Sequence, residues 1–237
     1  MKSLPFYSVI YDDNNIIAVN KSSGISVGGD RWDESKERLD KLIEKDLKIN
    51  KLFTVHRIDK ETSGIVVFAK NRDTHRSLST AFENRNVKKL YKLIVHGRPA
   101  WKEITCDLKL VPNGNKKHMT IIDKFRGKDS LTLFKVILSA GNYSILEAEP
   151  ETGRIHQIRV HIAALGYPVV CDELYGKINP IKLSSFKRAW KGDPSEERPL
   201  LARLGLHAEE LTLPGMQTIT APLPKDMSSL MKQMEKN

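Results

Sequence analysis

The order of strand-like and helix-like segments is the feature that most restricts the fold of this chain. Residues 105–150 contain three apolar or alternating runs in succession, and they predict strands at 105–111, 131–139 and 143–148. Because strands come in runs here and do not alternate strictly with helices, the sequence predicts an α+β fold. A doubly wound parallel sheet would require strict alternation of the two.

Other segments predict the elements around this stretch. Two apolar runs, 9–11 and 16–19, flank a polar Asp-Asp-Asn-Asn sequence, which is typical of a hairpin. Apolar residues at helical spacing predict helices over 35–48, from a cap at Asn71 or Asp73 through Phe82, over 155–165 with Gly166 as its C-cap, and over 225–236. The methionines of the last helix indicate core packing. Residues 177–200 are polar and predict a surface loop with one short helix.

One carboxylate, Asp59, lies in a polar, turn-prone segment between the apolar runs 53–55 and 65–69. The segment reads His56-Arg57-Ile58-Asp59-Lys60-Glu61-Thr62-Ser63-Gly64. Loops held by rigid neighbours often carry catalytic groups. An aspartate at a strand end more commonly has a structural role, in which its side chain hydrogen-bonds the backbone of a turn. On local features alone, the turn interpretation is the more frequent one.

Composition favours a polyanionic partner. The 237 residues include 29% charged residues and carry a formal net charge of +10, and such a surplus favours nucleic acids because each neutralised phosphate releases counterions. Two clusters interleave an aromatic ring with cations, namely Lys124-Phe125-Arg126-Gly127-Lys128 and Lys187-Arg188-Ala189-Trp190-Lys191. Aromatic rings in such a setting stack on unpaired bases, although charge runs are more often a solvated face.

The expected compartment is the cytoplasm. No stretch of about 18 apolar residues is present, so we expect no membrane-spanning helix. Asp12 and Asp13 interrupt the region where a signal peptide needs continuous apolar residues. The two cysteines lack Cys-x-x-Cys spacing, which suits a reducing compartment.

Two long motifs in order resemble one known family. The Asp59 segment and the later run Gly153-Arg154-Ile155-His156-Gln157-Ile158-Arg159-Val160-His161 together strongly resemble the RluA-type RNA pseudouridine synthases. That family carries His-Arg-Leu-Asp ending in Thr-Ser-Gly, and later Gly-Arg-x-His-Gln-(Ile/Leu)-Arg-Val-His. Further matches lie at 90–97, 19–24 and 206–208. Among the departures, Ser22 stands where relatives usually have proline, and Cys171 replaces a common glycine.

The resemblance implies a fold and a domain organisation. The expected fold is that of pseudouridine synthases, with a mixed, largely antiparallel central sheet flanked by helices and loops and an active-site cleft across the sheet. We expect a single catalytic domain over residues 1–237, without a separate N-terminal RNA-binding domain. A monomer is the default expectation.

The resemblance also implies a reaction and a nucleophile. Specific uridines in a structured ribosomal or transfer RNA stem-loop are isomerised: the C1′–N1 bond breaks, the uracil rotates, and C1′ joins C5. No redox change occurs, so neither a metal nor an organic cofactor is required. A carboxylate suits this chemistry, and Asp59 is the expected catalytic residue. Attack on C1′, attack on C6 and assistance to glycal formation all stay open.

Three further residues receive roles from the resemblance. Arg159 is expected to hold Asp59 and keep it charged, and the alternative for Arg159 is a surface position on a helix. Tyr91 is expected to stack on the target base or to transfer a proton, and its alternative is core packing. Arg57 is expected to fill the space left by a flipped uridine or to hold the RNA backbone. Its alternative is a solvated loop cation.

Other functions have less support from the sequence. A catalytically silent RNA-binding or ribosome-assembly protein on the same fold would be expected to lose the aspartate or the arginine, and both are present. A glycosidase would need paired carboxylates, for which Glu61 is the only close candidate. His156 and His161 are about 140° apart around a helix, so they do not share the face that zinc-binding pairs use. His207 is interpreted as a hydrogen-bonded core histidine.

Overall fold

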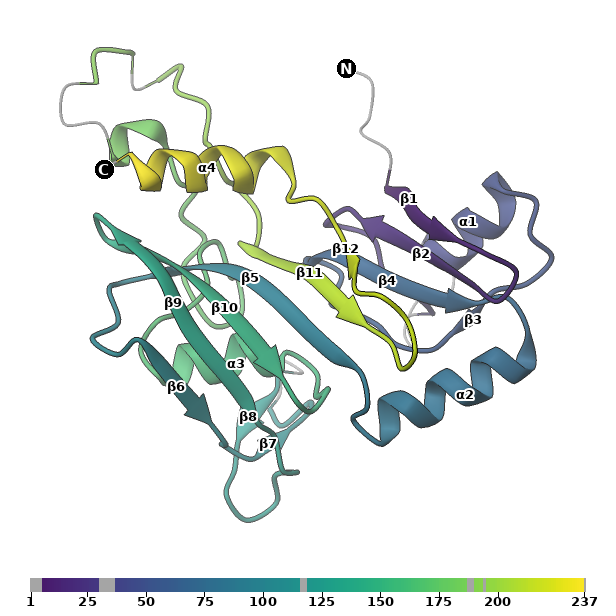
Figure 1. Cartoon of the computed structure of the whole chain (residues 1–237). Coiled ribbons are helices and arrows are strands. Elements are labelled where there is room, and N and C mark those ends of the chain that lie inside the picture. The colour runs from purple at the N-terminus through teal and green to yellow at the C-terminus, as the bar shows by residue number, and fades with distance from the viewer. Residues whose placement is uncertain (1–5, 30–36, 116–118, 187–189, 194, 237) are drawn as a thin grey trace. The chain divides into compact units, whose positions relative to one another are not determined.

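The computed structural model describes residues 6–29, 37–115, 119–186, 190–193 and 195–236 (Figure 1). The chain groups into two compact units. The first unit comprises Met1–Leu90 and His207–Pro222, and the second comprises Tyr91–Leu206 and Leu223–Asn237. The organisation as a single catalytic domain stays a prediction.

The first unit is built on a mostly antiparallel sheet. Its strands are β1 (Tyr7–Asp12), β2 (Ile16–Lys21), β3 (Phe53–Thr54), β4 (Ser63–Ala69), β11 (Leu206–Thr212) and β12 (Ile219–Thr220). Their order is β1-β2-β4-β11, with β3 beside β4 and β12 beside β11. β1 and β2 form the predicted hairpin, and Asp13 Oδ1 closes its turn by accepting from the amides of Asn15 and Ile16, both at 2.7 Å.

The parallel pairing of β4 with β11 depends on one glycine. Ser63 lies opposite His207, and Gly64 lies opposite Ala208. Gly64 has φ +117°, and a Cβ at this position would lie 2.2 Å from the Ala208 carbonyl oxygen. Only glycine fits both the backbone conformation and this close approach. The strand that follows the Asp59 segment is thereby fixed directly against β11.

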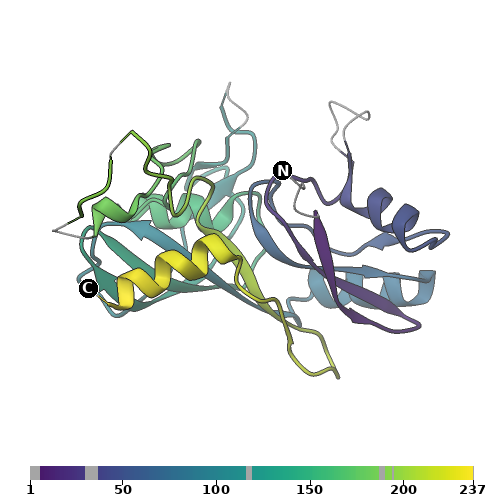
Figure 2. The ribbon, with the colours of Figure 1, turned by 90° about the horizontal axis from the view of Figure 1, so that it is seen from above.

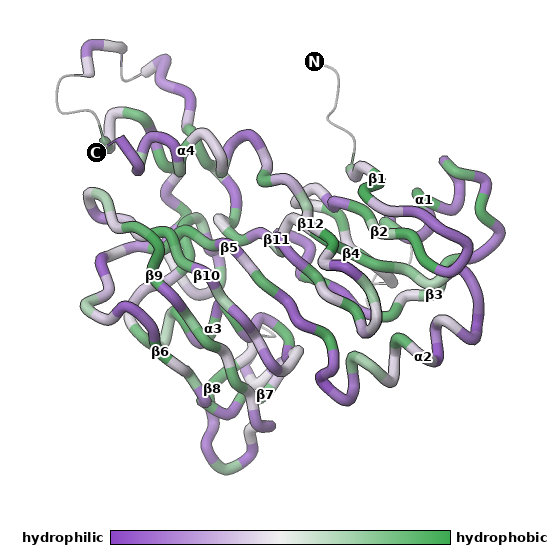
Figure 3. Tube along the Cα trace, viewed as in Figure 1, coloured by the Kyte–Doolittle hydropathy of each residue, from purple (hydrophilic) through white to green (hydrophobic). Residues whose placement is uncertain are grey.

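Two helices belong to the first unit, α1 (Leu39–Asp46) and α2 (Arg72–Glu83). The side chain of Asn71 accepts from the Thr74 amide at 2.9 Å and caps α2, in agreement with the predicted cap. α2 packs against β3 and β4 and places Leu78 in the apolar cluster of the unit. The tube of β2 is largely hydrophobic in Figure 3, whereas α2 is mostly hydrophilic, as expected for a helix with one buried side. The predicted start of the first helix, at residues 35–36, lies outside the described residues.

The second unit contains an antiparallel sheet and a separate two-stranded ribbon. Its strands are β5 (Lys88–His96), β6 (Glu103–Cys106), β7 (Leu110–Val111), β8 (Ile121–Ile122), β9 (Thr132–Ala140) and β10 (Tyr143–Pro150). The sheet has the order β5-β10-β9-β6, and β7 pairs with β8. The single strand predicted over 105–111 is therefore wrong. It is divided because the three residues between β6 and β7 are exposed, and the chain leaves β9 there to pair with β8.

Two helices, α3 (Gln157–Ala164) and α4 (Lys225–Glu235), cover opposite faces of this sheet (Figure 2). Two consecutive residues of β5 show this directly, because Leu93 packs in the cluster with Ile158 of α3, and Ile94 packs with Met227 of α4. The predicted core packing of α4 is confirmed. Gly166 follows α3 with φ +90°, the left-handed conformation of a helix end.

The polar segment at 177–200 is only partly the predicted surface loop. It contains the short 3₁₀ helix η1 (Leu183–Ser185), as expected. Ile181 and Phe186 are buried in the apolar cluster that α4 shares with β10, so the segment is anchored in the core. None of the helices in the described ranges is long and apolar enough to cross a membrane. The predicted α+β architecture with a mixed, largely antiparallel sheet is confirmed.

Candidate functional site

Asp59 lies half-buried in the first unit, on the loop between β3 and β4. The loop closes on itself, because the Thr62 amide donates to the Asp59 carbonyl at 3.2 Å. The next carbonyl, that of Lys60, accepts from the Gly24 amide at 2.8 Å. The turn that follows β2 therefore holds the main chain immediately after Asp59.

A buried lysine, Lys21, reinforces this support. It is fully buried at the end of β2, and its Nζ donates to the carbonyls of Ser22, Ile25 and Lys60, each at 2.9 Å. An ammonium group removed from water needs such acceptors to offset its lost hydration. Lys21 thus ties the Asp59 loop to β2. The sequence comparison matched residues 19–24 only as a lesser motif and assigned Lys21 no role.

The departure at Ser22 has a structural counterpart. The Ser22 amide donates to the Phe6 carbonyl at 2.8 Å, a bond that proline is unable to make. The next residue, Ser23, donates from Oγ to the Glu61 carbonyl at 2.6 Å. The turn is therefore bonded both to the N-terminal segment and to the Asp59 loop, with serine in place of the usual proline.

The start of the same loop is fixed by His56. Its Nε2 accepts from the Val67 amide at 3.0 Å, and its ring stacks on Phe82 with centroids 4.7 Å apart. Burial, together with the nearby charge of Lys89, lowers the pKa of His56 to about 3. His56 is therefore neutral and acts as a fixed acceptor that joins the loop to β4, a role that sequence reasoning missed.

Two more predicted positions belong to the first unit. Arg57 is exposed on the Asp59 loop, which suits both its predicted RNA contact and a solvated cation. His207 is fully buried, and its Nε2 donates to the Ala221 carbonyl at 3.2 Å, so its Nδ1 accepts from Ser63 Oγ at 2.9 Å. The interpretation of His207 as a hydrogen-bonded core histidine is confirmed.

Arg159 lies on α3 in the second unit, and its side chain is only 3% exposed. The alternative of a surface helix residue is therefore wrong. Its Nε and Nη2 donate to Asp172 Oδ2 and Oδ1, both at 2.8 Å, and the Asp172 side chain is fully buried. Such a two-point pair fixes the plane of the guanidinium as well as its position.

The charge of Asp172 is stabilised by more than Arg159. Burial by itself would raise the pKa of this carboxyl, but the Arg159 guanidinium and the amides of Leu174 and Tyr175 hold the pKa below its ordinary value. The carboxylate therefore stays ionised inside the unit. Sequence reasoning missed this partner, although Asp172 lies in the Val-Val-Cys-Asp-Glu-Leu-Tyr-Gly stretch that accompanied the family motif.

Tyr175 covers the guanidinium of Arg159, with 5.3 Å between Arg159 Cζ and the ring centroid. Its hydroxyl accepts from the Thr120 amide at 2.9 Å and shares a hydrogen bond with His156 Nδ1 at 2.9 Å. His156 precedes α3 with φ +54°, a left-handed conformation that costs free energy for a residue with a side chain. Arg159, Asp172, Tyr175 and His156 thus form one connected cluster, called the Arg159 cluster below.

Tyr91 is half-buried on β5, opposite Ala148 of β10. It packs against the apolar cluster that contains Leu93 and Ile158. The core-packing alternative therefore describes part of this side chain. A contact of Tyr91 with the target base stays a prediction.

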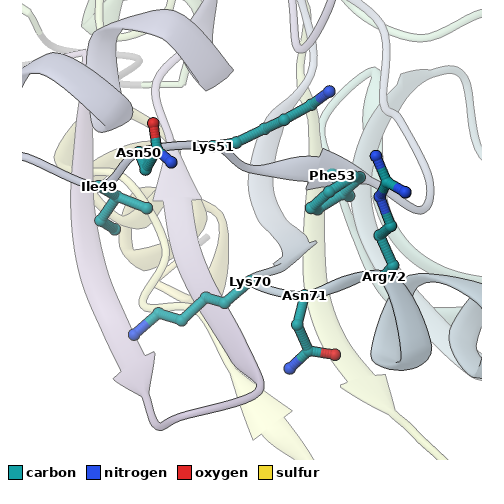
Figure 4. Close-up of a pocket in the computed structure, with 7 residues that line it drawn as sticks. All are labelled: Ile49, Asn50, Lys51, Phe53, Lys70, Asn71 and Arg72. Atoms are coloured by element: carbon teal, nitrogen blue, oxygen red, sulfur yellow. The ribbon is translucent and has the colours of Figure 1, made fainter.

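A basic hollow of about 400 Å³ lies elsewhere in the first unit (Figure 4). Its lining residues are Ile49, Asn50, Lys51, Phe53, Lys70, Asn71 and Arg72. Several of them have structural partners: Lys51 lies over the Phe53 ring, Lys70 pairs with Asp12, and Asn71 caps α2. Lys51 and Lys70 also point in opposite directions. None of the predicted site residues lines this hollow.

The predicted site residues divide between the two units. Asp59 and Arg57 share one loop of the first unit, whereas Tyr91 and Arg159 belong to the second. The pairing of Arg159 with Asp59 stays a prediction. Within the described part of the chain, no group of three or more His, Cys, Asp or Glu side chains is arranged to hold a metal ion.

Known sequences resemble this chain over most of its length. The family model described as RNA pseudouridylate synthase matches residues 15–164. The dual-specificity RNA pseudouridine synthase RluA of Escherichia coli is 33% identical over 210 residues, which are 88% of this chain and 87% of that protein. The ribosomal large subunit pseudouridine synthase D of Borreliella burgdorferi is 36% identical over 182 residues, which are 73% of this chain. The chain spans only about half of the latter protein, 55% of its length.

A solved structure shows the same fold. The human RNA pseudouridylate synthase domain containing 4 superposes with a TM-score of 0.73 and covers 96% of this chain and 92% of its own. At 24% sequence identity this likeness concerns the fold alone. The predicted pseudouridine synthase fold is confirmed.

Proposed function

Since this chain belongs to the RluA-type family of RNA pseudouridine synthases, we propose that it isomerises specific uridines to pseudouridine in a structured ribosomal or transfer RNA. The observation that carries the proposal is the construction of the Asp59 loop. It displays one half-buried carboxylate, while after it the Lys60 carbonyl is bonded to Lys21 of β2 and before it the His56 ring is bonded to the Val67 amide of β4. A catalytic group needs such a rigid support.

Asp59 is the proposed catalytic residue. The C1′–N1 bond of the target uridine breaks, C1′ bonds to C5, the C5 proton leaves to solvent, and N1 gains a proton. A carboxylate assists by attacking a carbon of the nucleotide or by stabilising charge at the sugar, as in glycosyl transfer. Attack on C1′, attack on C6 and assistance to glycal formation all remain compatible with Asp59. The reaction as written needs neither metal nor organic cofactor.

Arg159 is the proposed partner of the Asp59 carboxylate. A guanidinium near a carboxylate keeps it ionised and oriented in a site from which water is excluded. The Arg159 cluster supports this role, because Asp172 uses Nε and Nη2 and thereby sets the direction of Nη1. The ring of Tyr175 lies against the guanidinium and limits its movement in that direction. Asp172 and Tyr175 act in this proposal as positioning residues.

Tyr91 and Arg57 are the proposed RNA-contacting residues. Tyr91 offers an amphipathic ring that stacks on the target base or transfers a proton. The exposed Arg57 is placed to hold the RNA backbone or to fill the space that a flipped uridine leaves. RNA is the proposed partner, and the net charge of +10 supports it. A cytoplasmic location and a monomeric state belong to the same proposal. The free, buried thiols of Cys106 and Cys171 are compatible with a reducing compartment.

Tritium release tests the proposal. Ribosomal and transfer RNAs of the same organism are transcribed in vitro with 5-tritiated UTP, so that no uridine is modified beforehand. Wild-type protein is expected to release tritium to water, and Asp59→Asn is expected to slow release more than about a thousand-fold, because the acting carboxylate is removed. Mapping the modified uridine then identifies the RNA.

The same loop provides a matched control. Glu61 is an exposed carboxylate two positions after Asp59, and Glu61→Gln is expected to leave tritium release within about two-fold of wild type. Equal loss in both variants would reassign the chemistry to the loop as a whole. RNA binding without tritium release by wild type would indicate the silent RNA-binding protein instead.

A further inference from the structure

The most exposed large apolar side chain in the described part of the molecule is Phe125, at 85%. Ile178 follows at 63%. Phe125 lies in the turn 123–128, which follows β8 in the second unit. An aromatic ring held in water at a turn is unfavourable by itself. Single exposed apolar side chains are common, so the structure of the turn and the charges beside the ring decide whether Phe125 marks a binding surface.

The turn that carries Phe125 is rigid. Asp123 Oδ1 accepts from the amides of Phe125 and Arg126 at 2.9 and 3.0 Å, and Asp123 Oδ2 pairs with Arg126 Nε at 2.7 Å. The Gly127 amide also donates to the Asp123 carbonyl at 2.8 Å, and a Cβ on Gly127 would lie 2.3 Å from that oxygen. The main-chain and side-chain bonds of Arg126 and Phe125 lower the pKa of Asp123 to about 2, so the turn keeps its bonds at neutral pH.

Cationic residues precede and follow Phe125 in the turn. Lys124 Nζ lies over the Phe125 ring at 4.8 Å from its centroid. The Arg126 side chain is 74% exposed and Lys128 is exposed as well. One face of the ring thus has a cation above it, and the high exposure leaves the rest of the ring open. The combination of an aromatic face with flanking cations fits a base and its phosphates better than an apolar protein surface.

The ribbon that carries the turn is fastened to the helix of Arg159. The Leu108 carbonyl, just before β7, accepts from His161 Nε2 of α3 at 2.9 Å. The Thr120 amide, just before β8, donates to the Tyr175 hydroxyl of the Arg159 cluster at 2.9 Å. The ribbon that carries the turn at 123–128 is therefore attached to α3 and to Tyr175 of the Arg159 cluster.

From these observations we infer that Phe125 is a stacking platform for an unpaired base of the RNA substrate, with Lys124 and Arg126 on the adjacent phosphates. The inference rests on the proposed function, since it concerns the RNA substrate of the proposed isomerase. Base–aromatic stacking tolerates any base, because each has a π-face. Phe125 thus contributes affinity for unpaired RNA next to the target and does not select the target uridine.

Fluorescence anisotropy with two labelled probes tests the inference. One probe is a fluorescein-labelled 20-nucleotide oligouridine, and the other is a blunt 20-base-pair RNA duplex. Phe125→Ala is expected to weaken oligouridine binding about ten-fold and to leave duplex binding unchanged, because paired bases offer no open face. Phe125→Tyr keeps the ring and is expected to bind oligouridine within about two-fold of wild type.

Two further variants test whether the effect of Phe125 comes from base stacking, from the loss of any exposed apolar side chain, or from the neighbouring charges. Ile178→Ala removes another exposed apolar side chain of the same unit and is expected to leave both affinities unchanged. Lys124→Gln is expected to reduce the slope of log affinity against log salt by about one, whereas Phe125→Ala keeps the wild-type slope. Wild-type affinity of Phe125→Ala for oligouridine, or an equal loss on the duplex, would overturn the inference.

The tritium assay distinguishes this outcome from a failure of the proposed function. If Phe125→Ala loses oligouridine affinity while wild type releases no tritium, the stacking platform stands and the isomerase proposal falls. If wild type releases tritium and Phe125→Ala matches it in both assays, the isomerase proposal stands and the stacking platform falls.

Discussion

The Asp59 loop and the Arg159 cluster fix a charged residue in two different ways. Asp59 is half-buried, and its loop is held by the Lys60 carbonyl, which accepts from Lys21 and Gly24, and by the His56 ring, which accepts from an amide of β4. Arg159 is buried, and it is held by side chains, with Asp172 on two nitrogens and Tyr175 over the guanidinium.

The difference predicts how each region responds to substitution. The turn beside Asp59 has Ser22 where relatives usually have proline, and the Ser22 amide adds a main-chain bond to the Phe6 carbonyl. A buried ion pair depends on both partners, because removal of one leaves an uncompensated charge inside the unit. We therefore expect the largest loss of stability when one partner of the buried Arg159–Asp172 pair is removed.

The largest effect on stability is expected from Asp172→Ala. This change leaves the buried Arg159 guanidinium without its carboxylate and is expected to lower the free energy of unfolding by about 4 kcal/mol. Urea-induced unfolding followed by circular dichroism measures it. Asp226 provides the control, because it pairs with Arg203 in the same two-point geometry at a partly exposed position.

Asp226→Ala is expected to cost only about 1 kcal/mol, because solvent screens the charge that remains. Equal losses in the two alanine variants would show that burial does not set the importance of the Arg159–Asp172 pair. Burial of the ion pair would then no longer explain why the Arg159 cluster is expected to be the more sensitive region.

Lys21→Met tests whether main-chain support of the Asp59 loop is structural or catalytic. It removes a buried ammonium that serves three carbonyls and is expected to cost about 3 kcal/mol. Tritium release measured well below the unfolding transition is expected to fall as well, because the Lys60 carbonyl loses a donor. Lys70→Met, at a partly exposed lysine that pairs with Asp12, is expected to change neither property much. Full activity of folded Lys21→Met would limit Lys21 to stability.

His56 makes the first unit sensitive to acid. Its pKa is about 3 in the folded chain and about 6.5 when unfolded, so between these values the unfolded state binds one more proton. Stability is therefore fully present above about pH 6.5 and decreases as the pH falls, by about 2 kcal/mol between pH 7 and 5.

His56→Asn keeps a side-chain acceptor for the Val67 amide and removes the titrating group. The unfolding free energies of wild type and His56→Asn are compared at pH 7 and at pH 5, and wild type is expected to lose more stability between them. Burial also lowers the pKa of His96 and His161 in the second unit, so both proteins share their contribution. Parallel pH dependences of wild type and variant would contradict the role of His56.

The smallest effect is expected at Cys171, the residue before Asp172. Its φ of +56° is the conformation that glycine adopts freely, and relatives usually have glycine there. Cys171→Gly relieves this strain but removes a buried thiol, so the unfolding free energy is expected to change by less than about 1 kcal/mol. Gly64→Ala in the first unit is the opposite case, because its Cβ would overlap the Ala208 carbonyl. Thermal unfolding of both variants checks the contrast.

Local patterns in the sequence predicted many of the elements. The hairpin at 9–19, the cap at Asn71 and the methionine-rich helix α4 all follow from neighbours a few positions apart. The sequence also predicted the Asp59 loop between two strands. The strand predicted at 105–111 failed because its division depends on pairing with β8 and β9, and a local pattern does not contain that information.

The α+β class, the family motifs and the identity of the residues proposed for chemistry could all be read from the order of the amino acids. The partners that position these residues became known from the folded chain. Lys21 reaches a carbonyl 39 positions away, His207 reaches Ser63 across 144 positions, and Thr120 reaches Tyr175 across 55. Periodicity records which side of a helix or strand is apolar. The burial of a charge and the partner that compensates it depend on segments that meet only when the chain folds.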